Sequence, residues 1–346
     1  MTRTPDAAML PWSQAGQGAD PRLRALSFAL LAPNPHNRQP WLARLDGTDE
    51  IMIYRDAALN LPATDPFDRQ LTIGMGCFLE LLSLAAAQDG FDAITTLFPD
   101  GEALDQPVAH VRLTRGGTPD PLFAHTLNRH TNRDAYDLDR GLSMNELKSV
   151  IDPISGARGS QSNDIVTALR DLTLDAMITE LKTKATYMES VELTRIGARE
   201  INATPDGLTL RGPMMEALAS VGMLTREQMA RQDGPAFDRV IAMFETSFSA
   251  TPGYVWVPTG QNTRRDQIAA GRTWMRLHLS ATAQGLALHP VSQSLQEYPE
   301  VQPHYRAVHD LLAPNGDRLQ MLARIGYGPQ QPPAPRWPLE KRLIND

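Results

Sequence analysis

The sequence lacks the features that mark several classes of protein. Its 346 residues include a single cysteine, Cys77, so no disulfide can form within the chain. No uninterrupted apolar run approaches the roughly 20 residues that cross a bilayer. The first residues contain neither an apolar signal segment nor a pair of arginines. We therefore expect no membrane partner and a cytoplasmic protein, or a periplasmic one if a twin-arginine signal precedes this sequence.

Positive charge is also in deficit. The 33 Lys and Arg residues are outnumbered by 40 Asp and Glu residues, and the net charge of -7 disfavours a nucleic-acid partner. Neither common glycine-rich nucleotide loop is present. His304 and His309 are one residue too far apart to act as metal ligands one helical turn apart, so we expect no metal site. Cys77 lies in the apolar run IGMGCFLELL, where a buried, unreactive thiol is expected.

What the sequence does contain is a repeated pattern. The segment DRQLTIGMGCFLELLSLAAAQDGF, from Asp68, is similar to RRDQIAAGRTWMRLHLSATAQGL, from Arg264. Gly76 and Gly90 are spaced as Gly271 and Gly285 are. Each segment is typical of an amphipathic helix that ends at a glycine and leads into a strand. Two amphipathic helices can share this by chance, but the flanking strands also correspond, so we favour a duplication.

Local signals predict the remaining elements. Asp-Pro pairs at residues 20, 65 and 120 are typical of helix starts, and Ser143 with Glu146 forms a capping box. One long helix is expected over residues 164–193, and the proline-rich tail PQQPPAPRWPLEKRL is expected to be extended. The predicted strands are WLARL, EIMIYRD, AITTLF, AHVRLT, YVWVPT, LALHPV and LQMLARIGY. Strands interleaved with helices in both halves predict an α/β or α+β protein.

Two polar segments are candidate binding motifs. APNPHNRQPW places rigid prolines and amide side chains between a helix and a strand. In LNRHTNRDAYD, Arg129, Thr131 and Arg133 alternate, so two guanidinium groups and a hydroxyl can converge on one phosphate. From spacing alone, a rigid helix–strand corner explains the first segment, and a solvated polar turn explains the second.

Four segments together resemble the FMN-dependent nitroreductases. APNPHNRQPW resembles the family's Pro-Ser-x-x-Asn-x-Gln-Pro-Trp signature, and RHTNR resembles its Arg-x-Ser-x-Arg phosphate motif with Thr131 in place of serine. IGYG (325–328) and PAPRWPLEKRL resemble the family's C-terminal strand and arm. The resemblance implies a nitroreductase-like α+β fold, an α/β sandwich. It also implies FMN as cofactor, NAD(P)H as electron donor, and a small-molecule nitro or quinone-like acceptor.

The order of the motifs resembles the single-chain, Acg-type branch of the family. The first half keeps the proline motif and the second half opens with the phosphate motif, so together they supply one FMN site. Residues 1–120 and 121–346 are then two tandem nitroreductase-like halves that form an intramolecular pseudo-dimer. Such a chain can act as a monomer, and further dimerisation stays open.

The resemblance also implies the site residues. The loop residues Pro33, Asn34, Pro35 and Asn37 would approach the flavin from the opposite half, with Asn34 replacing the family's serine. A backbone N–H near Pro290, Val291, Ser292 and Gln293 would bond the flavin N5. The phosphate would be bound by Arg129, His130, Thr131, Arg133 and Arg336. The flavin supplies the redox chemistry, so no catalytic acid or base is expected.

The segment from residue 202 to 252, here called the insert, interrupts the second half. It contains Met214, Met215, Met223, Met229 and Met243. Methionines can form an adaptable wall over a flat ligand, so we expect a lid that controls access to the flavin. The alternative is a helical subdomain. A fixed lid would favour an FMN-sequestering protein with little turnover over a reductase.

Overall fold

Two four-stranded antiparallel sheets form the framework of the protein, for which a computed structural model describes residues 6–345. When the strands are counted along the chain within each sheet, both sheets have the order first, second, fourth, third. The first is β1 (Trp41–Asp46), β2 (Glu50–Arg55), β4 (Ala109–Arg115), β3 (Phe91–Leu97). The second is β5 (Arg158–Ser160), β8 (Gly253–Thr259), β10 (Arg318–Gly326), β9 (Ala287–Pro290). The α+β class predicted from the sequence is confirmed.

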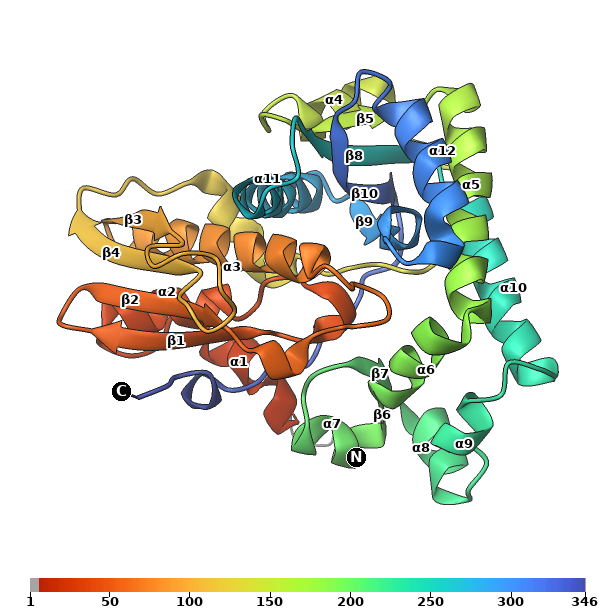
Figure 1. Cartoon of the computed structure of the whole chain (residues 1–346), viewed down its shortest axis with the longest axis horizontal. Helices are drawn as coiled ribbons and strands as arrows, with labels where there is room; N and C mark the ends of the chain where they lie inside the picture. The colour runs from red at the N-terminus through yellow and green to blue at the C-terminus, as the bar shows by residue number, and fades with distance from the viewer. Residues whose placement is uncertain (1–5, 346) are drawn as a thin grey trace.

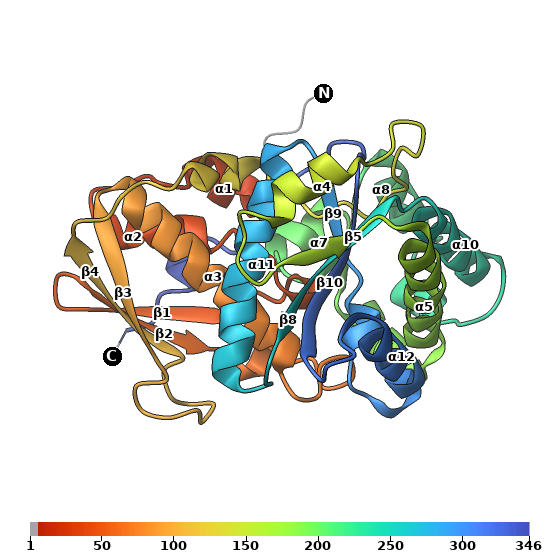
Figure 2. The same ribbon diagram turned by 90° about the horizontal axis from the view of Figure 1, so that it is seen from above.

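The two repeated segments form the central helices α3 (Arg69–Gln88) and α11 (Arg264–Ala283), which cross at the middle of the molecule (Figures 1 and 2). A Cβ atom on Gly76 would lie 2.2 Å from the carbonyl oxygen of Ile268. A Cβ atom on Gly271 would lie 2.0 Å from the carbonyl oxygen of Ile73. Such an approach requires glycine in both helices. The contact is reciprocal, as in an interface with two-fold symmetry.

Helix α3 is long and apolar enough to cross a membrane, with a mean hydropathy of 1.5 over its best window. The expectation that no segment approaches this was wrong, because it considered uninterrupted runs and not an average. However, 89% of that window is buried inside the protein. Cys77 is buried there with its Sγ 3.2 Å from the Gly271 carbonyl oxygen, and burial raises the pKa of the thiol to about 12.

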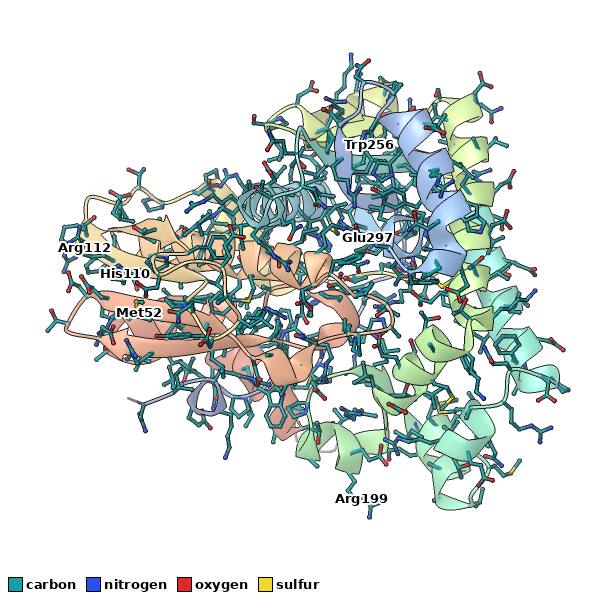
Figure 3. The ribbon with its side chains drawn as sticks, in the orientation of Figure 1. Met52, His110, Arg112, Arg199, Trp256 and Glu297 are labelled. Atoms are coloured by element: carbon teal, nitrogen blue, oxygen red, sulfur yellow. The ribbon has the colours of Figure 1, made fainter. Side chains whose placement is uncertain are left out.

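The first sheet has one buried face and one polar face. Ile51 and Ile53 are fully buried in the same apolar core as α3. The alternate residues Met52, His110 and Arg112 lie on the other face, at the edge of the molecule farthest from Glu297 (Figure 3). This alternation is the pattern expected for an antiparallel sheet with one packed face.

Three helices cover the outer face of the second sheet: α5 (Asn163–Lys182), α10 (Pro235–Ser249) and α12 (Gln302–Leu312). Their apolar side chains pack on Tyr254, Trp256 and Leu322 in a second core. The other helices are α1 (Leu10–Gln14), α2 (Pro21–Ala29), α4 (Met144–Ile151), α6 (Lys184–Glu192), α7 (Gly197–Ala203), α8 (Pro213–Ser220) and α9 (Arg226–Met229). A short parallel pair, β6 (Thr194–Ile196) and β7 (Leu208–Leu210), lies among them.

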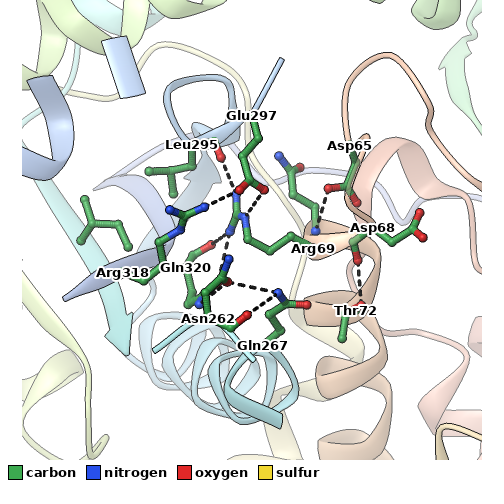
Figure 4. A network of polar contacts seen from close by, with 12 residues as sticks. Asp65, Asp68, Arg69, Thr72, Asn262, Gln267, Leu295, Glu297, Arg318 and Gln320 are labelled. Atoms are coloured by element: carbon green, nitrogen blue, oxygen red, sulfur yellow. Dashed lines mark hydrogen bonds and ion pairs between the residues drawn. The ribbon is translucent and has the colours of Figure 1, made fainter. Parts of the chain in front are cut away.

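A buried polar network fastens the two halves together (Figure 4). Arg69, at the start of α3, donates to Glu297 (3.0 Å) and to the Gln320 carbonyl oxygen (3.0 Å) in the second half. Arg264, at the start of α11, donates to the Thr72 hydroxyl in the first half (3.0 Å). Each central helix therefore begins with an arginine that reaches across to the other half.

Two predicted helices differ from the structure. The predicted helix over residues 164–193 is broken at Thr183, whose backbone is extended. Beyond the break, the Thr186 hydroxyl bonds the Glu180 carbonyl oxygen (2.7 Å), which stabilises the turn. Asp120-Pro121 begins a 3₁₀ segment, η4 (Pro121–Asn128), instead of an α-helix.

Other local predictions hold with small shifts. Helix α3 begins at Arg69, later than the signal at residue 65, although the Asp65 carboxylate does cap it by accepting from the Gln70 (3.1 Å) and Leu71 (2.9 Å) N–H groups. The tail is extended as predicted as far as Pro338, and it then forms the 3₁₀ segment η7 (Leu339–Lys341). It returns to the first half, where Leu343 pairs beside Ala43 of β1.

Candidate functional site

Two buried arginines from distant parts of the chain meet just beyond the end of α2. Arg129 and Arg336 both donate to the carbonyl oxygen of Leu31, at 3.2 and 3.1 Å. Arg336 also donates to the Ala32 carbonyl oxygen (3.1 Å). Carbonyl groups at a helix C-terminus lack intrahelical partners and carry partial negative charge, which explains how this position attracts two guanidinium groups.

Neither arginine has an acidic partner within ion-pair distance among residues 6–345. Both are 3% exposed, and the Nε atom of each is buried without a hydrogen bond. Burial lowers the pKa of Arg129 to about 10, and burial together with the Arg129 charge lowers the pKa of Arg336 to about 9. Buried charges in proteins are usually paired. The donor set therefore fits an anionic ligand such as a phosphate.

Arg133 completes the motif from a different direction. Its side chain is exposed, and its guanidinium makes no hydrogen bond to any residue that the structure describes. Its charge nevertheless lowers the pKa of both His36 and His289, after the larger effect of burial. Arg133 therefore lies near the proline loop of the first half and near β9 of the second half.

Thr131 and His130 occupy the same segment. Thr131 pairs beside Leu288, so this segment lies along the edge of β9. The His130 ring lies 5.1 Å from the Trp12 ring. Burial, with the charges of nearby arginines, lowers the pKa of His130 to about 4, so the imidazole is neutral at pH 7. His130 can therefore donate or accept a hydrogen bond but adds no charge.

The proline loop is held in a strained conformation. His36, Asn37 and Gln39 have φ angles of 47°, 52° and 54°, in the left-handed region that non-glycine residues seldom adopt. Pro33 and Pro35 flank Asn34, and a Cβ atom on Gly74 of α3 would lie only 3.0 Å from that of Asn34. The loop thus packs tightly on the central helix.

Both loop amides are used within the chain. Asn34 accepts from the Gln39 N–H (2.8 Å) and donates to the Ala32 carbonyl oxygen (3.2 Å). Asn37 accepts from Arg336 (2.6 Å) and donates to the Pro335 carbonyl oxygen (3.0 Å). Direct contact of these amides with a flavin stays a prediction, whereas Asn37 visibly orients Arg336. The Nδ1 atom of His36, a residue that the sequence analysis did not select, is buried without a partner.

The turn after β9 is the fourth part of the site. Pro290 is the last residue of β9, and the Val291 N–H donates to the Leu322 carbonyl oxygen (2.9 Å), so it cannot also bond a ring. Ser292 and Gln293 begin the 3₁₀ segment η5 (Ser292–Leu295), where the helix supplies no acceptor for the first N–H groups. Of the four predicted residues, these two offer the backbone donors.

The insert is anchored to the proline loop, a connection that sequence reasoning missed. Three contacts join them: Arg38 with Asp206 (2.7 Å), Gln39 with the Pro205 carbonyl oxygen (2.7 Å), and the Gly207 N–H with the Asn37 carbonyl oxygen (3.3 Å). Met214, Met223 and Met243 are 67%, 66% and 56% exposed. At most Met215 and Met229 remain for the predicted apolar cover.

A cavity of about 580 Å³ lies elsewhere, between α5 and α12. Thr179, Lys182 and His304 line it, on the side of α5 opposite Glu180. It contains none of the buried arginines. Among residues 6–345 there is no group of three or more His, Cys, Asp or Glu that could hold a metal ion.

Comparison with known proteins tests the resemblance. No family model matches the chain. Two proteins from Mycobacterium tuberculosis, strains CDC 1551 and H37Rv, are each named a putative NAD(P)H nitroreductase. Each is 26% identical to this chain over 341 residues, covering 90% of this chain and 87% of the relative. The resemblance to nitroreductases is confirmed.

Solved structures of nitroreductases and nitroreductase-like proteins match this chain more distantly. A nitroreductase-like family protein from Bacillus cereus is 12% identical to this chain, with a TM-score of 0.36. The match covers 66% of this chain and 97% of the Bacillus cereus protein. The FMN-dependent nitroreductase NfnB from Mycobacterium smegmatis, in complex with NADPH, is 14% identical, with coverages of 65% and 98% and a TM-score of 0.38.

Proposed function

We propose that this protein is an FMN-dependent NAD(P)H oxidoreductase of nitroreductase type. The observation that carries the proposal is the pair of buried arginines, Arg129 and Arg336, which share the Leu31 carbonyl and lack an acid. An FMN phosphate supplies the dianion that such a pair would bind with short, charge-assisted bonds. The names of the two relatives, each a putative NAD(P)H nitroreductase, support the electron donor and the type of acceptor.

The residues of the chain would bind, orient and enclose the cofactor. Arg129 and Arg336 would hold the phosphate from the buried side, with Thr131 and Arg133 adding a hydroxyl and a third cation. The Ser292 and Gln293 N–H groups would face the polar edge of the ring. When bound, FMN supplies hydride transfer between NAD(P)H and a small-molecule acceptor such as a nitro compound or a quinone.

A binding experiment tests the cofactor directly. Purified protein is saturated with FMN, freed of unbound flavin, and analysed for flavin per chain. We expect one FMN per chain, because the two halves contribute complementary parts of one site. Two per chain would contradict a single site, and none would contradict the proposed function. Oxidation of NADPH and NADH by the loaded protein, with and without a nitro acceptor, then tests turnover.

The alternative function is FMN binding with little turnover. One observation favours it: the insert is anchored to the proline loop by the Arg38–Asp206 ion pair and two further hydrogen bonds. A cover fixed in this way would compete with nicotinamide for the ring. Removing residues 213–229 while keeping β7 should then speed flavin reduction in stopped-flow measurements without loss of FMN. An unchanged rate would show that the insert is a helical subdomain and not a lid.

We further infer a division into two nitroreductase-like halves, residues 1–120 and 121–346. The shared strand order and the reciprocal glycine contact support it. Both parts of the site are covalently joined, so a monomer should retain FMN. Sedimentation at decreasing concentration, with flavin followed in parallel, checks this, and loss of flavin on dissociation of a dimer would contradict it. We infer a cytoplasmic location, which fractionation of the source cells would test.

A further inference from the structure

The turn that follows β9 is hydrogen-bonded to the buried carboxyl group of Glu180. Glu180 of α5 is 6% exposed and accepts from the side-chain amides of Gln296 (2.5 Å) and Gln293 (3.5 Å). It makes no ion pair with any Lys, Arg or His in residues 6–345. Gln293 is the second residue of η5, the segment expected to face the flavin. Glu180 therefore lies directly behind that segment.

The hydrogen bonds around Glu180 are unbalanced. The carbonyl oxygens of both amides, Gln293 Oε1 and Gln296 Oε1, are buried without a donor, as is the Tyr298 hydroxyl. An ionised carboxylate can only accept hydrogen bonds, so it turns both amide NH₂ groups toward itself. The protonated acid carries one O–H donor, which can satisfy one of these carbonyl oxygens. One proton therefore reverses the orientation that an amide prefers.

We propose that Glu180 is a positioning residue whose protonation turns the Gln293 amide, so that its NH₂ group faces the flavin site. The proton comes from solvent and binds a carboxylate oxygen; no other bond is made or broken. In the ionised state the Gln293 carbonyl oxygen points away from Glu180, as observed. In the protonated state the Gln293 NH₂ group, and not its carbonyl oxygen, points away from Glu180. The proposal rests on the proposed function, because the ligand of the turned amide is the edge of the oxidised flavin, which presents acceptors at N5 and O4.

The surroundings of Glu180 place its protonation near neutral pH. Burial raises the pKa of Glu180 to about 7; the two amide contacts oppose this rise, and the charge of Glu189 on α6 adds to it. Glu189 is itself held by the Ala63 and Thr64 N–H groups. Tyr298 is the other titratable group that faces Glu180, and burial keeps it neutral by raising its pKa. Glu300 acts on Tyr298 and not on Glu180.

Because proton binding to Glu180 and FMN binding are linked, the proposal predicts in which direction FMN affinity changes with pH. An oxidised flavin that accepts from the turned amide binds best when Glu180 is protonated, so the FMN affinity of the wild type should fall relative to that of Glu180→Gln as pH rises through about 7. The FMN phosphate, whose second pKa is about 6, titrates alike with both proteins and cancels in this comparison. By reciprocity, FMN binding should raise the Glu180 pKa by the same factor. We expect about a threefold to tenfold change in the FMN dissociation constant, the range of a modest coupling.

The experiment has two independent readouts. The Glu180 carboxyl is titrated by carbon NMR in protein without and with FMN, with Glu180→Gln to assign the signal. FMN affinity is measured from pH 5.5 to 8.5 in the wild type, in Glu180→Gln, which mimics the neutral acid, and in Glu192→Gln, an exposed control. We expect titration near pH 7 and a wild-type FMN affinity that falls relative to that of Glu180→Gln as pH rises, whereas the ratio of the Glu192→Gln affinity to the wild-type affinity stays constant.

Each other outcome decides against the proposal. Titration of Glu180 at the ordinary value for a glutamate, or a ratio of wild-type to Glu180→Gln FMN affinity that does not change with pH, would overturn it. If Glu180→Gln does not fold, Gln293→Met replaces it: Glu180 should still titrate near pH 7, and the FMN affinity of the wild type should fall relative to that of Gln293→Met as pH rises. A protein that binds no FMN contradicts the proposed function, whereas the titration without FMN still shows whether Glu180 binds a proton near neutral pH.

Discussion

The two sheets have the same strand order, yet their third strands end differently. Beyond β9, Ser292 and Gln293 open the turn η5 with free backbone donors, backed by Glu180. Beyond β3, Phe98 adopts a φ of 50° and its N–H donates to the Val108 carbonyl oxygen (2.9 Å), so the chain folds back as a loop over residues 99–107. The cavity left there, beside Arg55, Phe98 and Arg264, is about 30 Å³, which is room for about one water molecule.

This difference lies in the loops and not in the framework that the two sheets share. The strands and central helices are alike in both halves because they form one packed core. The loops that follow the strands carry the ligand chemistry, and they can change without disturbing that core. The end of β9 is polar and lies against the titratable Glu180, whereas the end of β3 is filled by the loop over residues 99–107. The single FMN per chain that we propose follows from this asymmetry.

The largest effect is expected where the halves are most alike. Gly76→Ala should destabilise the protein by about 3 kcal/mol or more, because the added Cβ would lie 2.2 Å from the Ile268 backbone oxygen and force the helices apart. Gly260→Ala, where a Cβ atom meets nothing within 4 Å, is the matched control. Denaturant unfolding measures both. Equal stability of the two variants would show that the helix crossing tolerates separation.

The second prediction is a pH dependence of stability that arises at the end of β9, where Glu180 lies, and not at the end of β3. The folded-state pKa of Glu180 is raised from 4.5 to about 7, so its contribution to stability is fully present below about pH 4.5 and is lost as pH rises to about 7. The loss should be on the order of 3 kcal/mol, because each tenfold gain in proton affinity corresponds to about 1.4 kcal/mol. The stability of the wild type relative to Glu180→Gln, measured by urea unfolding at each pH, should fall across this window. A constant difference would contradict the raised pKa.

The third effect concerns the phosphate pair. Arg129→Met should weaken FMN binding by roughly 10-fold to 100-fold and leave riboflavin binding nearly unchanged, because only FMN presents a phosphate. The same change should stabilise the flavin-free protein by about 1 kcal/mol, since it removes a buried charge without an acid. Arg158→Met is the control, because Arg158 forms an exposed pair with Asp317 (3.3 Å). Equal losses of FMN and riboflavin affinity would move Arg129 out of the phosphate site.

The smallest effect distinguishes the starts of the central helices. Thr263 caps α11 in a capping box with Asp266, whereas Asp68 at the start of α3 has a left-handed backbone and no side-chain cap. Thr263→Ala should cost about 1 kcal/mol of unfolding free energy. Asp68→Ala should lose no cap, and its cost should come from its ion pair with Arg55 (2.8 Å). Thermal unfolding with Thr263→Ser as control checks the first value; no loss in Thr263→Ala would show that the cap is dispensable.

Much of the framework could be predicted from the sequence because its signals are local. The strands follow from alternation, and the capping box of Ser143 with Glu146 follows from side chains that bond their own helix start. The matched glycines Gly76 and Gly271 predicted two equivalent helices, although not that they touch each other. That contact depends on the packing of two segments far apart in the chain, which no local pattern encodes.

The candidate site was predictable only in part, for the same reason. The family motifs identified Arg129 and Arg336, but not that both bond the Leu31 carbonyl or that neither has an acid nearby. Glu180 carries no motif, because its environment comes from the fold of η5 against α5. The anchoring of the insert by Arg38 and Asp206 is likewise a contact between residues of different motifs and could not be read from either segment.

The C-terminal arm has a consequence for how the protein is made. Arg336 meets Arg129 only after the tail has returned to the first half, where Leu343 pairs beside Ala43 and the Arg336 N–H donates to the Ala8 carbonyl oxygen (2.9 Å). A nascent chain on the ribosome therefore cannot assemble the arginine pair until residue 336 has emerged. If that pair holds FMN, the cofactor can be held only after residue 336 has left the ribosome, and translation products that stop before the arm cannot retain it.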